Sequence, residues 1–557
     1  LIYDFEIFIK DWLVVIADLK NKLFFEIVND KESLRKFYES HQYDIWAGFN
    51  NKNYDQYIIK AILTGHDPYK VSKYIVAEDG LGFNYSDDFK KVNIYSYDVY
   101  NTLTHGLKFY EGSMGDSIEE SNVSFDIDRK LTDSEIKEVL KYCKHDVEET
   151  VKIFFLKLED FEAQAGLIKL SRPQYLSKTQ TQLAPIILKA EKRDSHTGEF
   201  LIDTPNTLKL SKYDFVREWY MDYKNHDYEK SLQADIAGVK HYFAWGGLHG
   251  AKEKYHYKGN ILLMDVASLY PSLMINYDLL SDAVKDKNIY KELRDKRLIY
   301  KKEHNPMHVP YKLVLNKTYG GMKDKNNALY DPRNANRVCI YGQLLILDLI
   351  EKLEPYIDLI QTNTDGLFVR YTDILKVKEV AKEWETRTGL TLEFTEATEV
   401  WQKDVNNYVL KLKDDSLKTK GAYVKELNPL DYGDYPIINK ALIAALTNNI
   451  PVEETISNAD DLIDFQMVCK ITGKFSAIYH GDKKLNEKCV RVFAANDTYP
   501  GITKEHSETK VKHKISNTPA HAFIDNGDIH GKLVPPMLNK YFYIDLANKR
   551  LKEFINV

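Results

Sequence analysis

An acidic residue directly follows an apolar run in the segment Asn260-Ile-Leu-Leu-Met-Asp265-Val-Ala-Ser-Leu-Tyr-Pro-Ser272. The run has the length of a buried strand, so it predicts that the Asp265 carboxylate stands at the end of that strand. Carboxylate oxygens in such a place suit a hard cation such as Mg²⁺. A pair of these ions needs more than one carboxylate, so the pattern requires a second acid nearby in the fold.

Asp365 is the candidate for that second acid. It lies in Ile360-Gln-Thr-Asn-Thr-Asp365-Gly-Leu-Phe-Val-Arg370, where apolar residues flank an Asn-Thr-Asp-Gly tip. This pattern predicts a β-hairpin. If its strands neighbour the strand that ends at Asp265, the two carboxylates lie side by side.

Three residues between the two acids share one face of a predicted helix. Lys312, Asn316 and Tyr319 stand at i, i+4 and i+7, which is helical spacing. We expect Gly320 to end this helix. The face offers a point charge for phosphate, an amide and an aromatic ring.

A second set of acids begins at the N-terminus. Asp4 and Glu6 alternate along a predicted strand and share a face. Asp55 stands where a strand feeds a helix, and Tyr142 and Asp146 are i and i+4 in the predicted helix over residues 134–158. Four carboxylates of this kind could hold two Mg²⁺ or Mn²⁺ ions for metal-assisted phosphodiester hydrolysis.

In this order, the central segments resemble the polymerase motifs of family B DNA polymerases. Residues 265–272 resemble DxxSLYPS, and residues 312–320 resemble KxxxNSxYG, with Lys317 where Ser is usual. The hairpin tip resembles DTDS, with Asn363 for the first Asp and Gly366 for the Ser.

The N-terminal acids resemble the three exonuclease motifs of proofreading polymerases, which are DxE, Nx₂(F/Y)D and YxxxD. The resemblance implies an α/β and α+β multidomain chain, in which an RNase H-like DEDD exonuclease precedes a right-hand polymerase. The expected parts are an exonuclease (1–160), a connector (161–240), a palm (241–281 and 316–415), fingers (282–315), and a thumb with the C-terminal region (416–557).

The resemblance also implies the activity: a two-metal DNA-directed DNA polymerase that adds deoxynucleotides to a primer 3′-hydroxyl, with 3′→5′ exonuclease proofreading. The implied catalytic residues are Asp265, Asp365, Asp4, Glu6, Asp55, Asp146 and Tyr142. The six carboxylates and the Val266 carbonyl are the expected metal ligands, for Mg²⁺ or Mn²⁺. The implied nucleotide-binding residues are Lys312, Asn316, Tyr319, Tyr270, Ser268, Leu269, Arg297 and Arg294.

Contacts with DNA are expected from seven further residues, which are Asn51, Tyr54, Gly246, Gly247, Tyr408, Lys420 and Gly320. The two adjacent glycines lie in a segment that resembles the family's YxGG, although a plain turn is an equal alternative. Asn406-Asn-Tyr408 resembles the family's KxY, with Asn406 in place of the Lys.

The net charge of −6 does not exclude a DNA-binding protein, because charge can be unevenly spread. Residues 285–302 contain eight Lys and Arg against three Asp and Glu. This segment is either a solvated helix or a fingers helix whose Arg294 or Arg297 meets a triphosphate. Lys510, Lys512 and Lys514 alternate as on a strand, which predicts a basic edge for phosphates.

Within the resemblance to family B, the spacing of the motifs implies a compact, phage-type polymerase. Asp265 and Lys312 are 47 residues apart, and Lys312 and Asp365 are 53 apart, so neither gap can house a sizeable insertion. Protein-primed members of the family carry an insertion on each side of the KxxxNSxYG motif, so the resemblance makes protein priming and intrinsic strand displacement less expected. The expected partners are primer-template DNA and dNTPs, with a single-stranded DNA-binding protein or helicase as further candidates, and we expect a monomer in the cytoplasm of a host bacterium.

The 557 residues, 44% of them apolar, predict roughly three to four domains. Four separated cysteines form no Cys-x-x-Cys pair, which disfavours zinc and iron–sulfur sites and favours structural thiols in a reducing compartment. No apolar run approaches the length of a membrane span, and we expect no secretory segment. The first residue is not Met, so residues could precede it.

Two other classes of protein compete with the polymerase. One is a DNA-binding replication factor with degenerate catalytic sites, which Asn363 favours and intact Asp265 and Asp365 oppose. The other is a stand-alone nuclease whose C-terminal half only grips DNA, which the Lys312 motif opposes.

Overall fold

The computed structural model describes residues 1–194, 196 and 198–555, and it divides into two compact units. The first unit contains Leu1–Thr179, Leu427–Pro436 and Ala459–Phe542. The second contains Gln180–Glu426, Ile437–Asn458 and the described residues from Tyr543 onward. Helices and sheets occur in both units, so the predicted mixed α/β, multidomain organisation is confirmed.

The first unit opens with a five-stranded sheet in the order β3-β2-β1-β4-β5. Strand β1 is antiparallel to β2 and parallel to β4. The strands are β1 (Ile2–Ile7), β2 (Trp12–Asp18), β3 (Leu23–Val28), β4 (Ile45–Gly48) and β5 (Tyr95–Asp98). The helices are α1 (Lys31–Ser40), α2 (Asp55–Thr64), α3 (Pro68–Val76), α4 (Leu107–Met114), α5 (Asp133–Leu156) and α6 (Leu158–Lys169).

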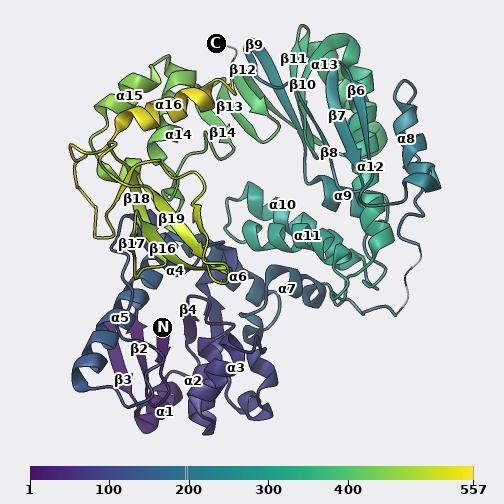
Figure 1. Cartoon of the computed structure of the whole chain (residues 1–557). Helices are drawn as coiled ribbons and strands as arrows, with labels where there is room; N and C mark the ends of the chain where they lie inside the picture. Colours follow the sequence, from purple (N-terminus) through teal and green to yellow (C-terminus); the bar gives the residue numbers. More distant parts are fainter. Residues whose placement is uncertain (195, 197, 556–557) are drawn as a thin grey trace. The chain divides into compact units, whose positions relative to one another are not determined.

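Both faces of this sheet are covered (Figure 1). One core contains Leu13 and Val15 of β2 with Val139 and Val147 of α5. Helices α1, α2 and α3 pack in a core on the opposite face, where the alternate strand residues point. Helix α5 begins where the sequence predicts, because Thr132 and Glu135 cap each other's backbone N–H groups.

The C-terminal part of the first unit is built from two small antiparallel sheets, ordered β15-β18-β21 and β17-β16-β19-β20. Their strands are β15 (Met467–Lys470), β16 (Phe475–His480), β17 (Lys483–Lys484), β18 (Cys489–Ala494), β19 (Ile502–His506), β20 (Lys512–Lys514) and β21 (Ala522–Ile524). We call this part the C-terminal β-region. Lys512 and Lys514 share β20 as predicted, but Lys510 lies outside the strand with a φ of 57°, so the prediction of three alternating lysines is wrong for Lys510.

Arg491 of β18 fastens the C-terminal β-region to helix α4. Its side chain is fully buried, and its guanidinium donates to the carbonyl oxygens of Gly112 and Asp116 near the end of α4. It also donates to the carbonyls of Asp525 and Gly527. Backbone carbonyls therefore replace a carboxylate as its partners.

The second unit is organised around a nine-stranded antiparallel sheet in the order β14-β13-β12-β9-β11-β10-β8-β7-β6. The strands are β6 (Ser231–Ile236), β7 (Val239–Ala244), β8 (Leu248–Ala251), β9 (Tyr255–Val266), β10 (Ile357–Thr362), β11 (Gly366–Tyr371), β12 (Leu392–Asp404), β13 (Asn407–Leu412) and β14 (Leu417–Lys420). Central strand β9 contains the apolar run Ile261–Met264, which is fully buried. An unbroken apolar run is what a strand covered on both faces requires.

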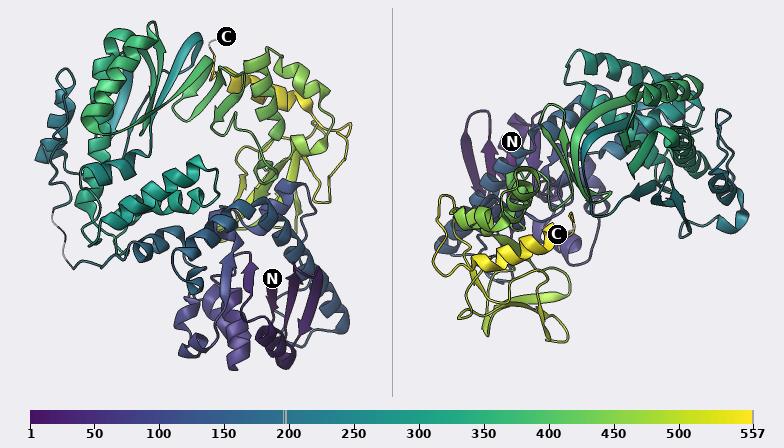
Figure 2. Two further views of the ribbon diagram at one scale, coloured as in Figure 1. Left: turned by 180° about the vertical axis from the view of Figure 1, so that it is seen from behind. Right: turned by 90° about the horizontal axis from the view of Figure 1, so that it is seen from above.

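The α-helices described in this unit are α7 (Gln180–Ile187), α8 (Asp214–Met221), α9 (Leu269–Asn276), α10 (Asn288–Lys302), α11 (His308–Lys323), α12 (Pro332–Leu353), α13 (Ile374–Thr388) and α15 (Val452–Asn458). Helices α14 (Pro436–Asn448) and α16 (Lys540–Leu551) lie mainly in it. Helices α12 and α13 lie along one face of the sheet (Figure 2). The side chain of Gln343 in α12 donates to the carbonyl of Ala244 in β7. The expectation that Gly320 ends its helix is wrong, because α11 continues to Lys323.

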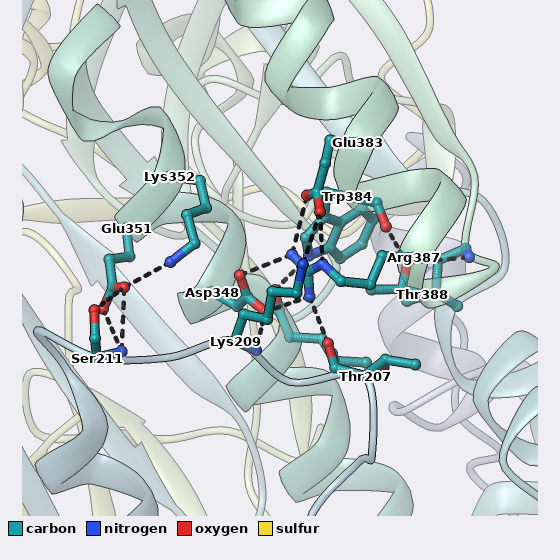
Figure 3. Close-up of polar contacts among 12 residues, drawn as sticks. Thr207, Lys209, Ser211, Asp348, Glu351, Lys352, Glu383, Trp384, Arg387 and Thr388 are labelled. Atoms are coloured by element: carbon teal, nitrogen blue, oxygen red, sulfur yellow. Dashed lines mark hydrogen bonds and ion pairs between the residues drawn. The ribbon is translucent and has the colours of Figure 1, made fainter.

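A network of charged groups fastens the extended segment before α8 to helices α12 and α13 (Figure 3). Arg387 donates to both oxygens of the buried Asp348 carboxylate at 2.8 and 3.1 Å. It also donates to the carbonyl of Thr207 and pairs with Glu383 at 3.0 Å. The backbone N–H of Lys209 donates to Asp348 at 2.8 Å.

No described helix is both long and apolar enough to cross a membrane.

Candidate active sites

Asp265 and Asp365 lie at the same end of two neighbouring interior strands, β9 and β11, of the nine-stranded sheet. Asp265 is the penultimate residue of β9 and is paired in register with Gly366, the first residue of β11. The backbone N–H of Val266 donates to the carbonyl of Asp365 at 2.7 Å. The predicted hairpin and its pairing with the strand of Asp265 are therefore confirmed.

Gly366 makes this close approach possible. A Cβ atom on residue 366 would lie too close to Oδ1 of Asp265, by about 0.9 Å relative to a minimum contact of 3.0 Å. It would also lie 2.8 Å from the carbonyl oxygen of Met264. Any other residue would therefore push the Asp265 carboxylate out of place.

Asn363 closes the turn that carries Asp365. Its side-chain oxygen accepts the N–H of Asp365 at 3.3 Å. Its own N–H donates to the carbonyl of Gly366 at 3.0 Å. The side chain at this position thus orders the hairpin tip. The Asn363 side-chain amide does so by forming an Asx turn.

Burial raises the pKa of Asp265, and Asp365 and Glu393 raise it further, while Lys418 lowers it. Tyr408 lies close enough to both aspartates for their charges to affect its pKa. Burial first, and then Asp265 and Asp365, raise the pKa of its hydroxyl to about 12. This buried ring packs on Phe368 in a T-shaped arrangement, with centroids 5.1 Å apart.

A cavity of about 810 Å³ opens in front of the two aspartates, within the size range of ligand pockets. Ten of the residues predicted for catalysis, metal binding or nucleotide binding line it. They are Asp265, Val266, Ser268, Leu269, Tyr270, Arg294, Arg297, Lys312, Asn316 and Asp365.

Several cations face this cavity. Arg297 of α10 donates to the hydroxyl of Ser268 at 2.5 Å, while its buried Nε has no partner among the described residues. Burial lowers the pKa of Arg297. Arg294 pairs with Asp295 at 2.9 Å, whereas Lys312 forms no ion pair within the described part of the chain. This arrangement suits a polyanionic ligand.

Tyr319 lies behind the cavity rather than in its lining. Its ring packs on Tyr270 with centroids 4.4 Å apart. The hydroxyl of Tyr270 is 3.9 Å from the sulfur of Cys339, and that of Tyr319 is buried without a partner among the described residues. Burial is the largest cause that raises the pKa of each hydroxyl.

The predicted DNA-contacting residues of the second unit surround this site without lining the cavity. Gly246 and Gly247 form the turn between β7 and β8, where a Cβ on residue 247 would lie 3.4 Å from Thr364 at the hairpin tip. Lys420 of β14 is paired in register with Tyr408 of β13. Gly320 lies inside α11, where an added Cβ would meet nothing within 4 Å.

The first unit brings the N-terminal carboxylates together. Asp4 and Glu6 offer ligand atoms within 4.8 Å of each other and of Cys143 of α5. Asp55 begins α2, and its carboxylate accepts the N–H of Phe5 in β1 at 3.2 Å. Asp146 stands on α5. Residues that are up to 142 positions apart in sequence thus converge on the middle of β1.

Burial is the largest cause that raises the pKa of all four carboxyls. The pKa of Asp55 rises to about 7 and that of Asp146 to about 6. The pKa values of Asp4 and Glu6 rise well above their usual range, because neighbouring acids add repulsion to burial. Buried carboxylates that repel one another form a donor set that a divalent cation would neutralise, so the residues fit such an ion.

Lys108 of α4 reaches this carboxylate cluster. Its Nζ lies 2.5 Å from Oδ1 of Asp146 and 3.0 Å from Glu111. It also lies 4.6 Å from the ring centre of Tyr142. A cation therefore already offsets part of the negative charge beside Asp146.

The side chains of Asn51 and Tyr54, the other predicted residues of the first unit, form hydrogen bonds within the protein. Asn51 is fully buried, and its amide donates to the carbonyl of Trp46 at 3.3 Å. The hydroxyl of Tyr54 lies 2.7 Å from that of Ser72. Asp98 accepts the N–H groups of Asn50 and Tyr100 at 2.8 and 3.0 Å, and so it orders the turn after β4.

No protein-family model matches the chain. A curated relative, DNA polymerase 1 of Sulfurisphaera ohwakuensis, is 23% identical over 297 residues. That match covers 44% of this chain and 33% of the relative, so the chain spans about a third of the relative's length. Among solved structures, the chain is similar to the family B DNA polymerase from the hyperthermophilic archaeon Pyrobaculum calidifontis, with 14% identity, a TM-score of 0.46, and coverage of 100% of this chain and 78% of that one.

Three charged residues at the two sites, Glu393, Lys418 and Lys108, were not predicted from the sequence. Glu393 of β12 is paired in register with Asp265 and bonds to Lys301 of α10 at 3.2 Å. Lys418 of β14 lines the same cavity, and Lys108 joins the other cluster. None belongs to a motif, and each is brought in by strand pairing or helix packing.

Proposed function

We propose that this chain is a DNA-directed DNA polymerase of the family B type with a separate 3′→5′ exonuclease site. The observation that carries the proposal is the pairing of β9 with β11. It sets Asp265 and Asp365 side by side at the edge of a cavity with several cations. The match to a DNA polymerase over 44% of the chain supports it.

Asp265 and Asp365, with the carbonyl of Val266, are the residues that would hold divalent cations in the second unit. Burial and the neighbouring acids raise the pKa of Asp265, so this donor set gains from a bound cation. Mg²⁺, when bound there, would supply the charge that activates a primer 3′-hydroxyl and stabilises the leaving pyrophosphate.

The side chains around these acids bind and orient an incoming deoxynucleotide. Lys312, Arg297 and Arg294 attract its phosphates. Tyr270, held from behind by Tyr319, packs against the sugar, and Asn316 faces the nascent pair. Selectivity among the four bases comes from the template.

The first unit supplies the proofreading site in this proposal. Its strand order, with β1 antiparallel to β2 and parallel to β4, supports an RNase H-like exonuclease. Asp4, Glu6, Asp55 and Asp146 would hold Mg²⁺ or Mn²⁺, which would supply an activated water for hydrolysis. Tyr142 orients that water, and Lys108 holds the Asp146 carboxylate in place.

The finer assignments belong to the same proposal. Residues 1–160 form the exonuclease, 161–240 the connector, 241–281 with 316–415 the palm, 282–315 the fingers, and 416–557 the thumb with the C-terminal region. Tyr408, Lys420 and the glycines at 246 and 247 hold the primer-template. We infer a compact phage-type replicative enzyme that acts as a monomer.

A primer-extension gel with Mg²⁺ tests the two activities separately. The unmodified chain should extend a primer when dNTPs are present and shorten it when they are absent. Asp265→Asn should reduce extension by about 100-fold or more, because metal-ligand charge stabilisation is worth several kcal/mol, and it should leave degradation intact. Asp4→Asn should do the reverse. If either variant removed both activities, the assignment of two sites would be wrong.

A further inference from the structure

The C-terminal β-region contains a cavity of about 600 Å³ that belongs to neither carboxylate site. It opens where its two small sheets meet. The Nε2 of His480 at the end of β16 donates to the carbonyl of Ala522 in β21 at 2.7 Å and so holds the two sheets together there. The cavity is large enough for a nucleotide-sized ligand.

Aromatic and apolar side chains form the wall of this cavity. Tyr499 and Phe523 both line it, with ring centroids 6.4 Å apart. Phe523 is stacked on Phe493 at 4.9 Å, so its ring is held in a fixed orientation. A rigid aromatic wall suits a flat ring such as a nucleobase, which stacks without regard to sequence.

The rim carries cations and hydrogen-bonding groups. Lys483 and Lys484 make up the short edge strand β17 and are exposed, and neither forms an ion pair among the described residues. Asn526 accepts the N–H of Arg491 through its side-chain oxygen, which leaves its amide N–H groups for a ligand. Glu487 adds a carboxylate acceptor.

The charge of the rim distinguishes a DNA strand from a free nucleoside triphosphate. Five cations line the cavity beside Asp265, with three carboxylates opposing them. The cations are Arg294, Arg297, Lys301, Lys312 and Lys418, and the carboxylates are Asp265, Asp365 and Glu393. This second cavity offers only two lysines, with Glu487 opposing them. Two cations match the single charges of two successive phosphodiesters better than they match the higher charge of a triphosphate.

Hydrogen bonds connect the cavity to the exonuclease candidate within the first unit. The carbonyl of Asn526 accepts the N–H of Ile118 at 2.8 Å. Its neighbour Arg491 donates to the carbonyl of Gly112 in α4 at 3.1 Å. Helix α4 also carries Lys108, which contacts Asp146. A ligand in the cavity is thus held by the same compact unit as the four carboxylates.

We propose that this cavity binds an unpaired nucleotide of a single DNA strand presented to the carboxylate site of the first unit. The base stacks on Tyr499 and Phe523, the adjoining phosphates contact Lys483 and Lys484, and Asn526 donates to the edge of the base. The inference rests on the proposed function, because it takes DNA as the substrate.

Fluorescence anisotropy of a labelled oligo-dT of about 12 nucleotides with the full chain tests this assignment over a range of salt concentrations. The double variant Lys483→Ala/Lys484→Ala should weaken binding and lower the slope of log K against log salt by about 1.4, which is 0.7 for each lost phosphate contact on a single strand. Tyr499→Ala should weaken binding about 5-fold or more with an unchanged slope. The control Lys70→Ala/Lys73→Ala removes the same charge from exposed positions on α3 and should change neither.

Two further measurements separate the alternatives. Exonuclease assays on the same oligonucleotide should show a higher KM and an unchanged kcat for Tyr499→Ala, whereas a merely structural defect would lower kcat. Thymidine monophosphate should compete only at far higher concentrations than the oligonucleotide. If it competes equally well, the occupant is a free nucleotide and the strand assignment is overturned.

Primer extension by the unmodified chain keeps this inference distinct from the proposed function. Normal extension together with unchanged oligo-dT affinity in Tyr499→Ala and the double lysine variant would overturn the cavity assignment alone. Loss of oligo-dT binding in these variants, in a chain that cannot extend a primer, would support the cavity and refute the polymerase.

Discussion

Replacing Gly366 by Ala tests whether the position of the Asp265 carboxylate determines the polymerase activity. The added methyl needs about 0.9 Å more room to reach 3.0 Å from Oδ1 of Asp265, and it also sits 2.8 Å from the carbonyl of Met264. The carbonyl belongs to the fully buried run Ile261–Met264 of β9 and resists movement, so the carboxylate is the group that shifts.

A misplacement of about 1 Å at a reacting centre can lower a rate by roughly 100-fold. We therefore expect Gly366→Ala to reduce the single-turnover extension rate by about that factor. The fold should persist, because the strain is relieved by one side chain at the end of β9.

Single-turnover primer extension, with thermal unfolding in parallel, is the appropriate assay. The exonuclease rate of the same preparation is an internal control, since Asp4 and its partners belong to the other unit. Extension at the rate of the unmodified chain, with an unchanged unfolding temperature, would refute the reasoning. A loss of both activities would instead indicate global misfolding.

Three further perturbations follow from the structure. Asp348→Asn leaves the Arg387 guanidinium with a neutral buried partner, so the free energy of unfolding should fall by up to about 3–5 kcal/mol; urea titration measures this, and an unchanged midpoint would contradict it. Folding raises the pKa of Asp55 from 3.8 to about 7, mainly through burial, so the folded state holds this proton more tightly. In EDTA, the stability of the fold should therefore fall as pH rises from about 4 to about 7. Asp55→Asn should flatten that part of the pH profile in urea titrations, and added Mg²⁺ should restore stability at pH 7. Lys108→Met removes the cation 2.5 Å from Asp146 and should slow degradation of a single strand by about 10- to 100-fold without affecting extension, whereas equal loss of both activities would exclude a local role.

The strands that carry the aspartates of the second unit could be predicted because their signals are local. An apolar run with an acid at its end marks β9, and an Asn-Thr-Asp-Gly tip marks the β10–β11 hairpin. Each depends on side chains within a few residues. The start of α2 at Asp55 was predictable for the same reason.

Predictions failed where distant contacts override local preference. Gly320 signals a helix end, yet α11 continues to Lys323 through Gly321 and Met322, both of which are buried. Packing therefore outweighs the glycine. Glu393 and Lys418 reach the cavity only through the pairing of β12 with β9 and of β14 with β13, which single-sequence patterns do not encode.

The partition of the chain has a consequence for its synthesis on the ribosome. The first unit draws on three separate stretches, of which the last ends at Phe542, and Arg491 from that stretch satisfies carbonyls at the end of α4. At about 5–20 residues per second, roughly 20–70 s of translation separate Thr179 from Phe542. The nascent N-terminal segment must wait that long with its α4 surface exposed, so a truncated product ending near Thr179 should depend on chaperones and aggregate in their absence.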